Sequence, residues 1–261
     1  MNSTAALVTG GARRLGRAMV LELARQGYDI ALHYIGADEE AHETAAQIKA
    51  LGVNVITLQA DLLVEEESQN LIARATEKLG KPLSVLINNA SVFEYDDIQT
   101  ATRQSWDRHM ESNLRAPFVL TQNFARQAPP TTADSQGEPL ASAVIINMID
   151  QRVRKLTPEF MTYTLAKMGL WALTQTSARA LAPQIRVNAI GPGPTLQGAR
   201  QSDEHFQNQR QATVLRRGSN PEDIVAAMRY ILAAPALTGQ LLCIDAGQHL
   251  GWQTPDVLGL E

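Results

Sequence analysis

The sequence predicts an α/β fold: a single doubly wound domain in which a parallel sheet of about seven strands carries helices on both faces. Short runs rich in Val, Ile and Leu alternate with longer segments whose apolar residues recur at helical spacing. Such uninterrupted apolar runs are typical of strands buried on both faces of a parallel sheet. Gly27, Gly52 and Gly80 each follow the last periodic residue of a helical segment, where a left-handed residue is favoured.

The expected elements follow one another as βα units along the chain. Strands are predicted over residues 5–9, 30–33, 53–59, 85–88, 143–148, 185–190 and 241–244. Helices are predicted over residues 14–26, 39–51, 65–79, 105–113, 117–127, 159–181 and 221–233. In the first helix, Leu15, Met19 and Leu23 share one face.

Two polar segments interrupt this alternation. Residues 128–142 are predicted to form a surface loop rather than a linker, so residues 1–261 are expected to form one domain. Residues 191–211 follow the carboxyl end of a strand, which is the edge where such sheets bind ligands. Within them, residues 195–211 are expected to close over a substrate.

Composition and charge exclude several classes of protein. The 261 residues are 19% charged and 44% hydrophobic, as in globular rather than disordered chains. A net charge of −4 offers no basic field for nucleic acid. Cys243 is the only cysteine and the five histidines are scattered, so neither an internal disulfide nor a metal site is expected. Without a secretion signal or an apolar run near the roughly 20 residues of a membrane span, a soluble cytoplasmic protein is predicted.

A glycine-rich turn, residues 9–16, lies between the first strand and the first helix. The pyrophosphate of a dinucleotide needs a tight turn and free N–H groups at a helix N-terminus, so this position predicts a Rossmann-type nucleotide site. Glycine also occurs in many βα turns merely to close them. Asp61 and Leu62 after the third strand support the nucleotide interpretation, because a carboxylate there can accept a hydrogen bond from an adenine amino group. Residues 88–91 form a turn of small and amide side chains after the fourth strand.

The end of the second strand favours NADPH over NADH as the cofactor. A site for NAD places a carboxylate there to hold the ribose hydroxyls. This chain instead has His33 and Tyr34, and its next acid, Asp38, is expected to cap the following helix. Arg13 in the glycine turn can reach a 2′-phosphate, although it can also be an ordinary solvated arginine of the first helical turn.

Tyr163 and Lys167 stand four residues apart in the long helix predicted over residues 159–181, so they share one face. A free tyrosine has a pKa of about 10, and a neighbouring ammonium group lowers it toward the range needed for acid–base catalysis. This spacing also arises often by chance on helix surfaces. It predicts catalysis only in combination with the nucleotide turn and the asparagine turn at residues 88–91.

The glycine turn, residues 88–90, Asn113, the Tyr163/Lys167 pair and residues 191–193 together resemble the short-chain dehydrogenase/reductase superfamily over residues 5–247. The resemblance implies that Tyr163 donates a proton, Lys167 binds the nicotinamide ribose and tunes the tyrosine, and Asn113 holds a water in the proton relay. It also implies a homotetramer with the long helices packed between subunits. The cofactor contacts expected on this basis are Gly10, Arg13, Arg14, Leu15, His33, Tyr34, Asp61, Leu62, Asn89, Ala90, Ser91, Tyr163, Lys167, Pro192 and Gly193.

Three departures from the superfamily pattern resemble the pteridine reductases and the bacterial dihydromonapterin reductases. Arg14 stands where the second glycine of the turn is usual, and Ser91 stands where a glycine usually ends the asparagine turn. Asp150, 13 residues before Tyr163, stands where most members carry a serine. Phe93 adds to the resemblance.

The chemistry of Asp150 independently favours nitrogen heterocycles as substrates. Ketone reduction builds negative charge on oxygen, which a carboxylate about 4 Å away would oppose by roughly 4 kcal/mol, on the order of a thousandfold in rate. A carboxyl group suits the ring N–H and amino groups of a pterin. Phe93 can stack on a flat ring and Arg14 can pair with the pterin edge and the cofactor phosphates. The alternatives are that Phe93 is a core aromatic and that Asp150 is a loop cap.

The predicted function is NADPH-dependent reduction of the C=N bond of a dihydropterin or dihydrofolate to the tetrahydro form, with Tyr163 and Asp150 relaying a proton to nitrogen. The expected substrate contacts are Arg14, Ser91, Phe93, Asp150 and Tyr163. One alternative is a general carbonyl or alcohol oxidoreductase that tolerates Asp150. Another is a nucleotide-sensing protein without catalysis, against which the intact proton relay argues.

Overall fold

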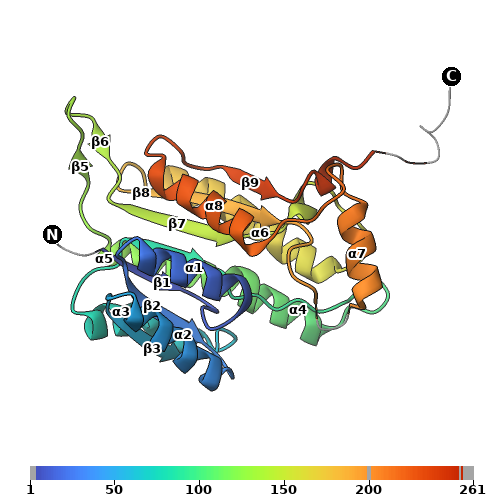
Figure 1. Cartoon of the computed structure of the whole chain (residues 1–261), viewed down its shortest axis with the longest axis horizontal. Coiled ribbons are helices and arrows are strands. Elements are labelled where there is room, and N and C mark those ends of the chain that lie inside the picture. Colours follow the sequence, from blue (N-terminus) through green and yellow to red (C-terminus); the bar gives the residue numbers. More distant parts are fainter. Residues whose placement is uncertain (1–3, 199–200, 253, 255–261) are drawn as a thin grey trace.

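Seven parallel strands form one continuous sheet, which confirms the predicted fold class (Figure 1). The structure is a computed structural model that describes residues 4–198, 201–252 and 254. The strands of the sheet, in sequence order, are β1 (Ala5–Val8), β2 (Asp29–Tyr34), β3 (Val55–Gln59), β4 (Val85–Asn88), β7 (Ala143–Met148), β8 (Ile185–Pro192) and β9 (Leu241–Ile244). Their spatial order is β3-β2-β1-β4-β7-β8-β9. The chain reverses its direction across the sheet between β1 and β4, the switch point at which such sheets bind ligands.

Helices cover both faces of the sheet (Figure 1). One face carries α1 (Arg14–Arg25), α2 (Asp38–Ala50) and α8 (Pro221–Ala233), and the other carries α3 (Glu65–Leu79), α5 (Ala116–Gln127) and α6 (Met161–Ala180). Because side chains alternate along a strand, β1 contributes Val8 to the first core and Leu7 to the second. All six helices agree with their predicted bounds within two residues.

Three segments differ from the prediction. The helix expected over residues 105–113 is α4 (Arg103–Met110) followed by a π-helical turn, η1 (Glu111–Arg115), that continues into α5. The loop expected over residues 128–142 contains an antiparallel hairpin, β5 (Thr132–Ala133) and β6 (Pro139–Leu140), which projects from the body of the protein (Figure 1).

The third difference is α7 (Asp203–Gln211), a helix in a polar segment for which no helix was predicted. Its N-cap, Ser202, accepts a hydrogen bond from the main-chain N–H of His205. None of the residues of α7 is buried. A helix without a buried face needs no apolar stripe, and for this reason its sequence shows no apolar periodicity that would predict a helix. Residues 199–200 of this segment, and most of the C-terminal stretch after Trp252, lie outside the described residues.

The positions expected for left-handed glycines are confirmed. Gly27, Gly52 and Gly80 have φ values of 87°, 84° and 67°. Among the described residues, no helix has the length and apolar character needed to cross a bilayer.

Candidate active site

The predicted site residues gather at the carboxyl ends of the central strands, on both sides of the switch point. Two hydrogen-bonded side chains join the turn after β1 to the turn after β4. Asn89 Nδ2 donates to the main-chain oxygens of Thr9 (2.8 Å) and Gly10 (3.2 Å). The Thr9 hydroxyl in turn accepts the N–H groups of Asn89 (2.9 Å) and Ala90 (3.0 Å). The two turns therefore form one hydrogen-bonded unit.

The glycine turn has the geometry and charge that a pyrophosphate requires. A Cβ atom on Gly16 would lie 2.0 Å from the oxygen of Gly10, so α1 begins in direct contact with the turn. The first turn of α1 contains no acidic residue, and its N-cap, Arg13, makes no side-chain cap bond. By contrast, α2 and α3 each carry three acidic residues in their first turns. An uncompensated helix N-terminus attracts anions, so these residues fit a dinucleotide.

Arg14 occupies a left-handed position, with φ of 55°, where the superfamily usually has glycine. This conformation costs a non-glycine residue roughly 1–2 kcal/mol. The guanidinium donates to the main-chain oxygens of Leu196 (3.2 Å) and Gln197 (3.0 Å). In this structure Arg14 therefore links the glycine turn to the segment after β8, a role that the sequence did not predict.

His33 lies behind the glycine turn and supports it from inside the protein. Its Nδ1 accepts the N–H of Gly10 and its Nε2 donates to the oxygen of Ala60, both at 3.0 Å. The side chain is 1% exposed, and burial lowers the pKa of His33 to about 4. The ring is therefore neutral and both its nitrogens are used within the protein.

Three other residues at the ends of β2 and β3, Tyr34, Asp38 and Asp61, also make hydrogen bonds within the protein. The expectation that Asp38 caps the next helix is wrong, because Ala37 is the N-cap and the Asp38 side chain bonds the Tyr34 hydroxyl instead. Asp61 accepts the N–H of Leu63 at 2.9 Å, and its own N–H donates to Glu67 at 2.6 Å. Glu67 therefore positions Asp61, a contact that no local sequence pattern predicts.

Gly193, after β8, is held against the last strand. Its N–H donates to the oxygen of Ile244 at 3.0 Å. A Cβ atom at this position would lie 2.6 Å from the Cα atom of Asp245. The backbone at Gly193 therefore lies so close to Asp245 that a residue with a side chain would collide with it.

The structure brings Asp150, Tyr163 and Lys167 together in one cluster, in which Tyr163 and Lys167 are buried and Asp150 is partly exposed. The Tyr163 hydroxyl donates to Asp150 Oδ2 at 3.1 Å, while Asp150 Oδ1 accepts the N–H of Arg152 at 2.8 Å. Asp150 thus combines both roles that the sequence allowed, since it caps the short helix η2 (Gln151–Val153) and also contacts the tyrosine. Lys167 Nζ donates to the oxygen of Met148 at 2.8 Å and lies 5.6 Å from the centre of the Tyr163 ring.

The electrostatics of this cluster correct one expectation. Burial and the adjacent Asp150 raise the pKa of Tyr163 well above its usual value, whereas Lys167 was expected to lower it. The reason is that the carboxyl group touches the phenol directly while the ammonium group bonds to Met148. Burial also raises the pKa of Asp150 and lowers the pKa of Lys167 to about 8. Tyr163 is therefore a neutral phenol, the form that can donate a proton.

Asn113 lies in the π-helical turn, and its side chain holds the segment that follows β4. Its Oδ1 accepts the N–H of Val92 at 2.9 Å, and its Nδ2 donates to the oxygen of Val92 at 2.8 Å. Each of these atoms keeps one further hydrogen-bonding position, and the role of Asn113 in holding a relay water stays a prediction.

An aromatic wall stands beside the catalytic cluster. The Phe93 ring stacks on Phe160 with centroids 4.4 Å apart, and meets the Tyr163 ring edge-on at 4.7 Å. Phe93 is 46% exposed, so it is not a core aromatic. Ser91, at the start of the same segment, hydrogen-bonds the phenol of Tyr163. Phe160, which was not predicted as a site residue, has a left-handed backbone with φ of 54°. The guanidinium of Arg152 lies over its ring, 4.7 Å from the ring centre.

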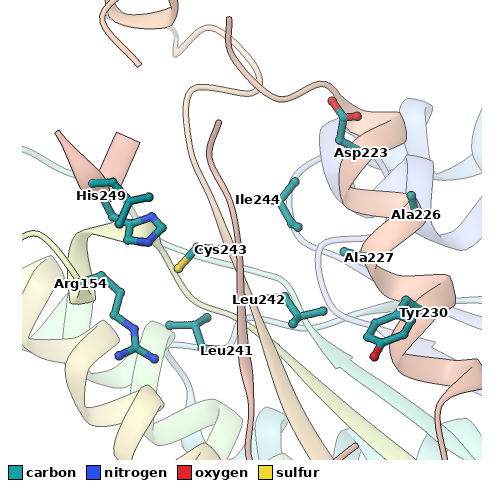
Figure 2. A pocket seen from close by; sticks show the side chains of 11 residues that line it. Arg154, Asp223, Ala226, Ala227, Tyr230, Leu241, Leu242, Cys243, Ile244 and His249 are labelled. Carbon is teal, nitrogen blue, oxygen red and sulfur yellow. The ribbon is translucent and has the colours of Figure 1, made fainter. Parts of the chain in front are cut away.

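A separate cavity of about 860 Å³ lies beside the edge strand β9 (Figure 2). In Figure 2, Tyr230 and Asp223 of α8 lie on one side of the strand, and Arg154 and His249 lie on the other. None of the predicted catalytic, cofactor or substrate residues lines this cavity.

Comparison with known proteins matches nearly the whole chain. A family model described as Enoyl-(Acyl carrier protein) reductase matches residues 10–249. The 3-oxoacyl-[acyl-carrier-protein] reductase FabG of Staphylococcus aureus is 30% identical over 250 residues, which cover 94% of this chain and 98% of that protein. The chain is a member of the short-chain dehydrogenase/reductase superfamily.

Two solved structures are more similar to this chain in sequence. FolM alternative dihydrofolate reductase 1 from Brucella suis, in complex with NADP, is 40% identical with a TM-score of 0.89, covering 97% of this chain and 98% of that one. Its counterpart from Brucella canis, also complexed with NADP, is 38% identical with a TM-score of 0.88, covering 98% of both chains. The predicted resemblance to a pterin-reductase-like subset is therefore confirmed, and the predicted cofactor is the nucleotide bound in both structures.

Proposed function

We propose that this protein is an NADPH-dependent reductase that converts the C=N bond of a dihydropterin or dihydrofolate to the tetrahydro form. The observation that carries the proposal is the partly exposed carboxyl group of Asp150, 3.1 Å from the Tyr163 hydroxyl. Such a group can accept hydrogen bonds from the ring N–H and amino groups of a pterin. The name of the 40% identical FolM structure supports the same class of substrate.

The nucleotide end of the site would hold the cofactor through its helix terminus and its arginine. The glycine turn and the start of α1 would take the pyrophosphate, and the exposed Arg13 can reach a 2′-phosphate. Pro192 and Gly193 would flank the nicotinamide. When bound, NADPH supplies the hydride that adds to the carbon of the C=N bond.

The residues of the catalytic cluster then supply the proton. Tyr163 gives its phenolic proton to the adjacent ring nitrogen, because burial and Asp150 keep the phenol protonated until a stronger base approaches. Lys167 is a buried cation beside the ring and stabilises the phenolate that remains. Phe93 offers an exposed aromatic surface for the flat heterocycle.

Substrate turnover tests this proposal directly. Purified protein is mixed with NADPH and dihydrobiopterin, dihydromonapterin or dihydrofolate, and the loss of reduced-nicotinamide absorbance is followed. We expect at least one of these substrates to be reduced much faster than a panel of ketones. Reduction of ketones alone would overturn the proposal.

A general carbonyl reductase is the second candidate, favoured by the 30% identity to FabG ketoacyl reductase. In that case Asp150 would be a tolerated substitution without a role in substrate choice. The same panel separates the two candidates, because a carbonyl reductase prefers ketones.

We also propose that the protein is a homotetramer in which the long helices pack between subunits. In support, α5 exposes Phe118, and α6 exposes Leu165 and Met168. Exposed apolar side chains on long helices are typical of subunit interfaces. Light scattering on the purified protein is expected to give four times the 28.5 kDa mass of one chain, and a monomer would contradict the proposal.

A further inference from the structure

A buried chain of hydrogen bonds outside the catalytic cluster passes through the residue next to Tyr163. The main-chain N–H of Glu94 donates to His109 Nε2 at 3.1 Å, so His109 Nδ1 carries the ring proton and donates to the Thr162 hydroxyl at 2.7 Å. That hydroxyl donates to Asp96 Oδ2, and the N–H of Thr162 donates to Asp96 Oδ1 at 3.0 Å. Every proton in the chain is assigned, because a main-chain N–H only donates and a carboxylate only accepts.

This cluster also supplies the cap that α6 lacks. The N-cap of α6, Phe160, makes no side-chain cap bond. Asp96, from another segment, supplies the missing cap. Its main-chain oxygen accepts the N–H of Met161 at 3.2 Å, and its carboxylate accepts the N–H of Thr162. Although burial opposes it, hydrogen bonding by Thr162 holds the pKa of Asp96 below its usual value. A negative charge at a helix N-terminus is stabilising.

The cluster joins the two parts of the site that must meet on a substrate. Glu94 follows Phe93 in the aromatic wall, and Thr162 precedes Tyr163 in α6. Asp96, His109 and Thr162 are 1%, 0% and 2% exposed, so the connection is shielded from water. The His109 ring also packs edge-on against the Tyr163 ring, with centroids 5.9 Å apart.

We propose that Asp96, His109 and Thr162 are positioning residues that fix Tyr163 relative to Phe93. Without them, α6 loses its cap and the aromatic wall loses its link to the proton donor. A misplacement of about 1 Å can cost on the order of a hundredfold in rate. The identity of the substrate rests on the function proposed above, whereas the positioning itself depends only on the contacts described.

Thr162→Val is the sharpest test, because it keeps the shape of the side chain and removes the hydroxyl at the centre of the cluster. Thr162→Ser retains the hydroxyl, and Thr176→Val removes an exposed hydroxyl from the same helix as a matched control. We expect Thr162→Val to lower kcat for the dihydropterin by about tenfold or more, with NADPH affinity within about twofold of wild type. Thr162→Ser and the control are expected to stay near wild type. A kcat within about twofold of wild type in Thr162→Val, or an equal loss in Thr162→Ser, would overturn the proposal.

Asp96→Asn tests the direction of the protons. Whichever way the new amide is oriented, its NH₂ group faces either the N–H or the hydroxyl of Thr162. In the second case the hydroxyl has two choices. It can accept from both the amide and His109 Nδ1, which leaves its own proton unpaired, or it can donate to Nδ1, which places the ring proton on Nε2, facing the N–H of Glu94. A buried donor is therefore unpaired or faces another donor in every arrangement, so we expect a larger loss of kcat than in Thr162→Val, and a smaller loss would contradict the assignment.

Amide hydrogen exchange gives a measurement that does not depend on the substrate. We expect residues 161–163 to exchange faster in Thr162→Val than in Thr176→Val, because the cap of α6 is weakened. If the wild-type protein reduces no pterin, the proposed function fails and exchange alone decides the positioning role. Equal exchange rates in the two variants would then overturn it.

Discussion

Acid is expected to destabilise this protein through His33. The folded-state pKa of about 4 lies below the ordinary value of 6.5, so an unfolded chain binds a proton at pH values where the folded chain does not. The stability contributed by the neutral ring is therefore complete above pH 6.5 and is lost as the pH falls from 6.5 to about 4. At 1.36 kcal/mol per pKa unit, the full loss is about 3 kcal/mol, of which about 2 kcal/mol is lost by pH 5.

Urea unfolding at pH 7 and pH 5 measures this effect when wild type is compared with His33→Gln. Glutamine can accept the N–H of Gly10 and donate to Ala60 without titrating. We expect the wild type to lose about 2 kcal/mol more unfolding free energy than the variant between the two pH values. His42→Gln, at an exposed position, is the control and should keep the wild-type difference. If His33→Gln shows the same pH dependence as wild type, other groups carry the acid sensitivity and the reasoning fails.

Three further outcomes are expected. Gly16→Ala should abolish NADPH binding in a fluorescence titration, because its Cβ atom would lie 2.0 Å from the oxygen of Gly10, and wild-type affinity would refute that contact. Arg14→Gly should change the unfolding free energy by less than about 1 kcal/mol, because lost hydrogen bonds are offset by roughly 1–2 kcal/mol of relieved strain. Hydrogen exchange of the main-chain amides after β8 should nevertheless be faster in Arg14→Gly than in wild type. A large loss of unfolding free energy in this variant would contradict the argument that the left-handed backbone of Arg14 is strained. Finally, the pKa of about 8 for Lys167 means that its ammonium group loses a proton as the pH rises through 8. We therefore expect kcat/KM to fall above pH 8. A flat profile to pH 10 would contradict the role of Lys167 in stabilising the phenolate.

The parallel sheet was predictable because its strands are continuous apolar runs. The bounds of β4, β7 and β9 agree with the prediction at both ends. Local patterns carried no signal for α7, which buries none of its residues, or for the π-helical turn that contains Asn113. A π turn adds a residue to a helical turn without any change in composition that a helical period would reveal.

The site was predictable where function depends on local spacing or on a resemblance. The four-residue spacing of Tyr163 and Lys167 places both in one buried cluster, and the resemblance marked Asp150. Contacts between distant segments were not predictable: Asp96 meets Thr162 across 66 positions of sequence. The predicted direction of the Tyr163 pKa shift was wrong for a related reason, because the burial of the ring and its contact with Asp150 appear only in three dimensions.

The role of Asp150 in choosing the substrate is the central claim, and one ratio tests it most directly. The measurement is kcat/KM for a dihydropterin divided by kcat/KM for a ketone, in wild type and in Asp150→Ser, with NADPH affinity as the control for folding. We predict that the substitution shifts the ratio toward the ketone by on the order of a hundredfold to a thousandfold, since removing a carboxylate about 4 Å from a developing oxyanion relieves roughly 4 kcal/mol. An unchanged ratio would contradict the account.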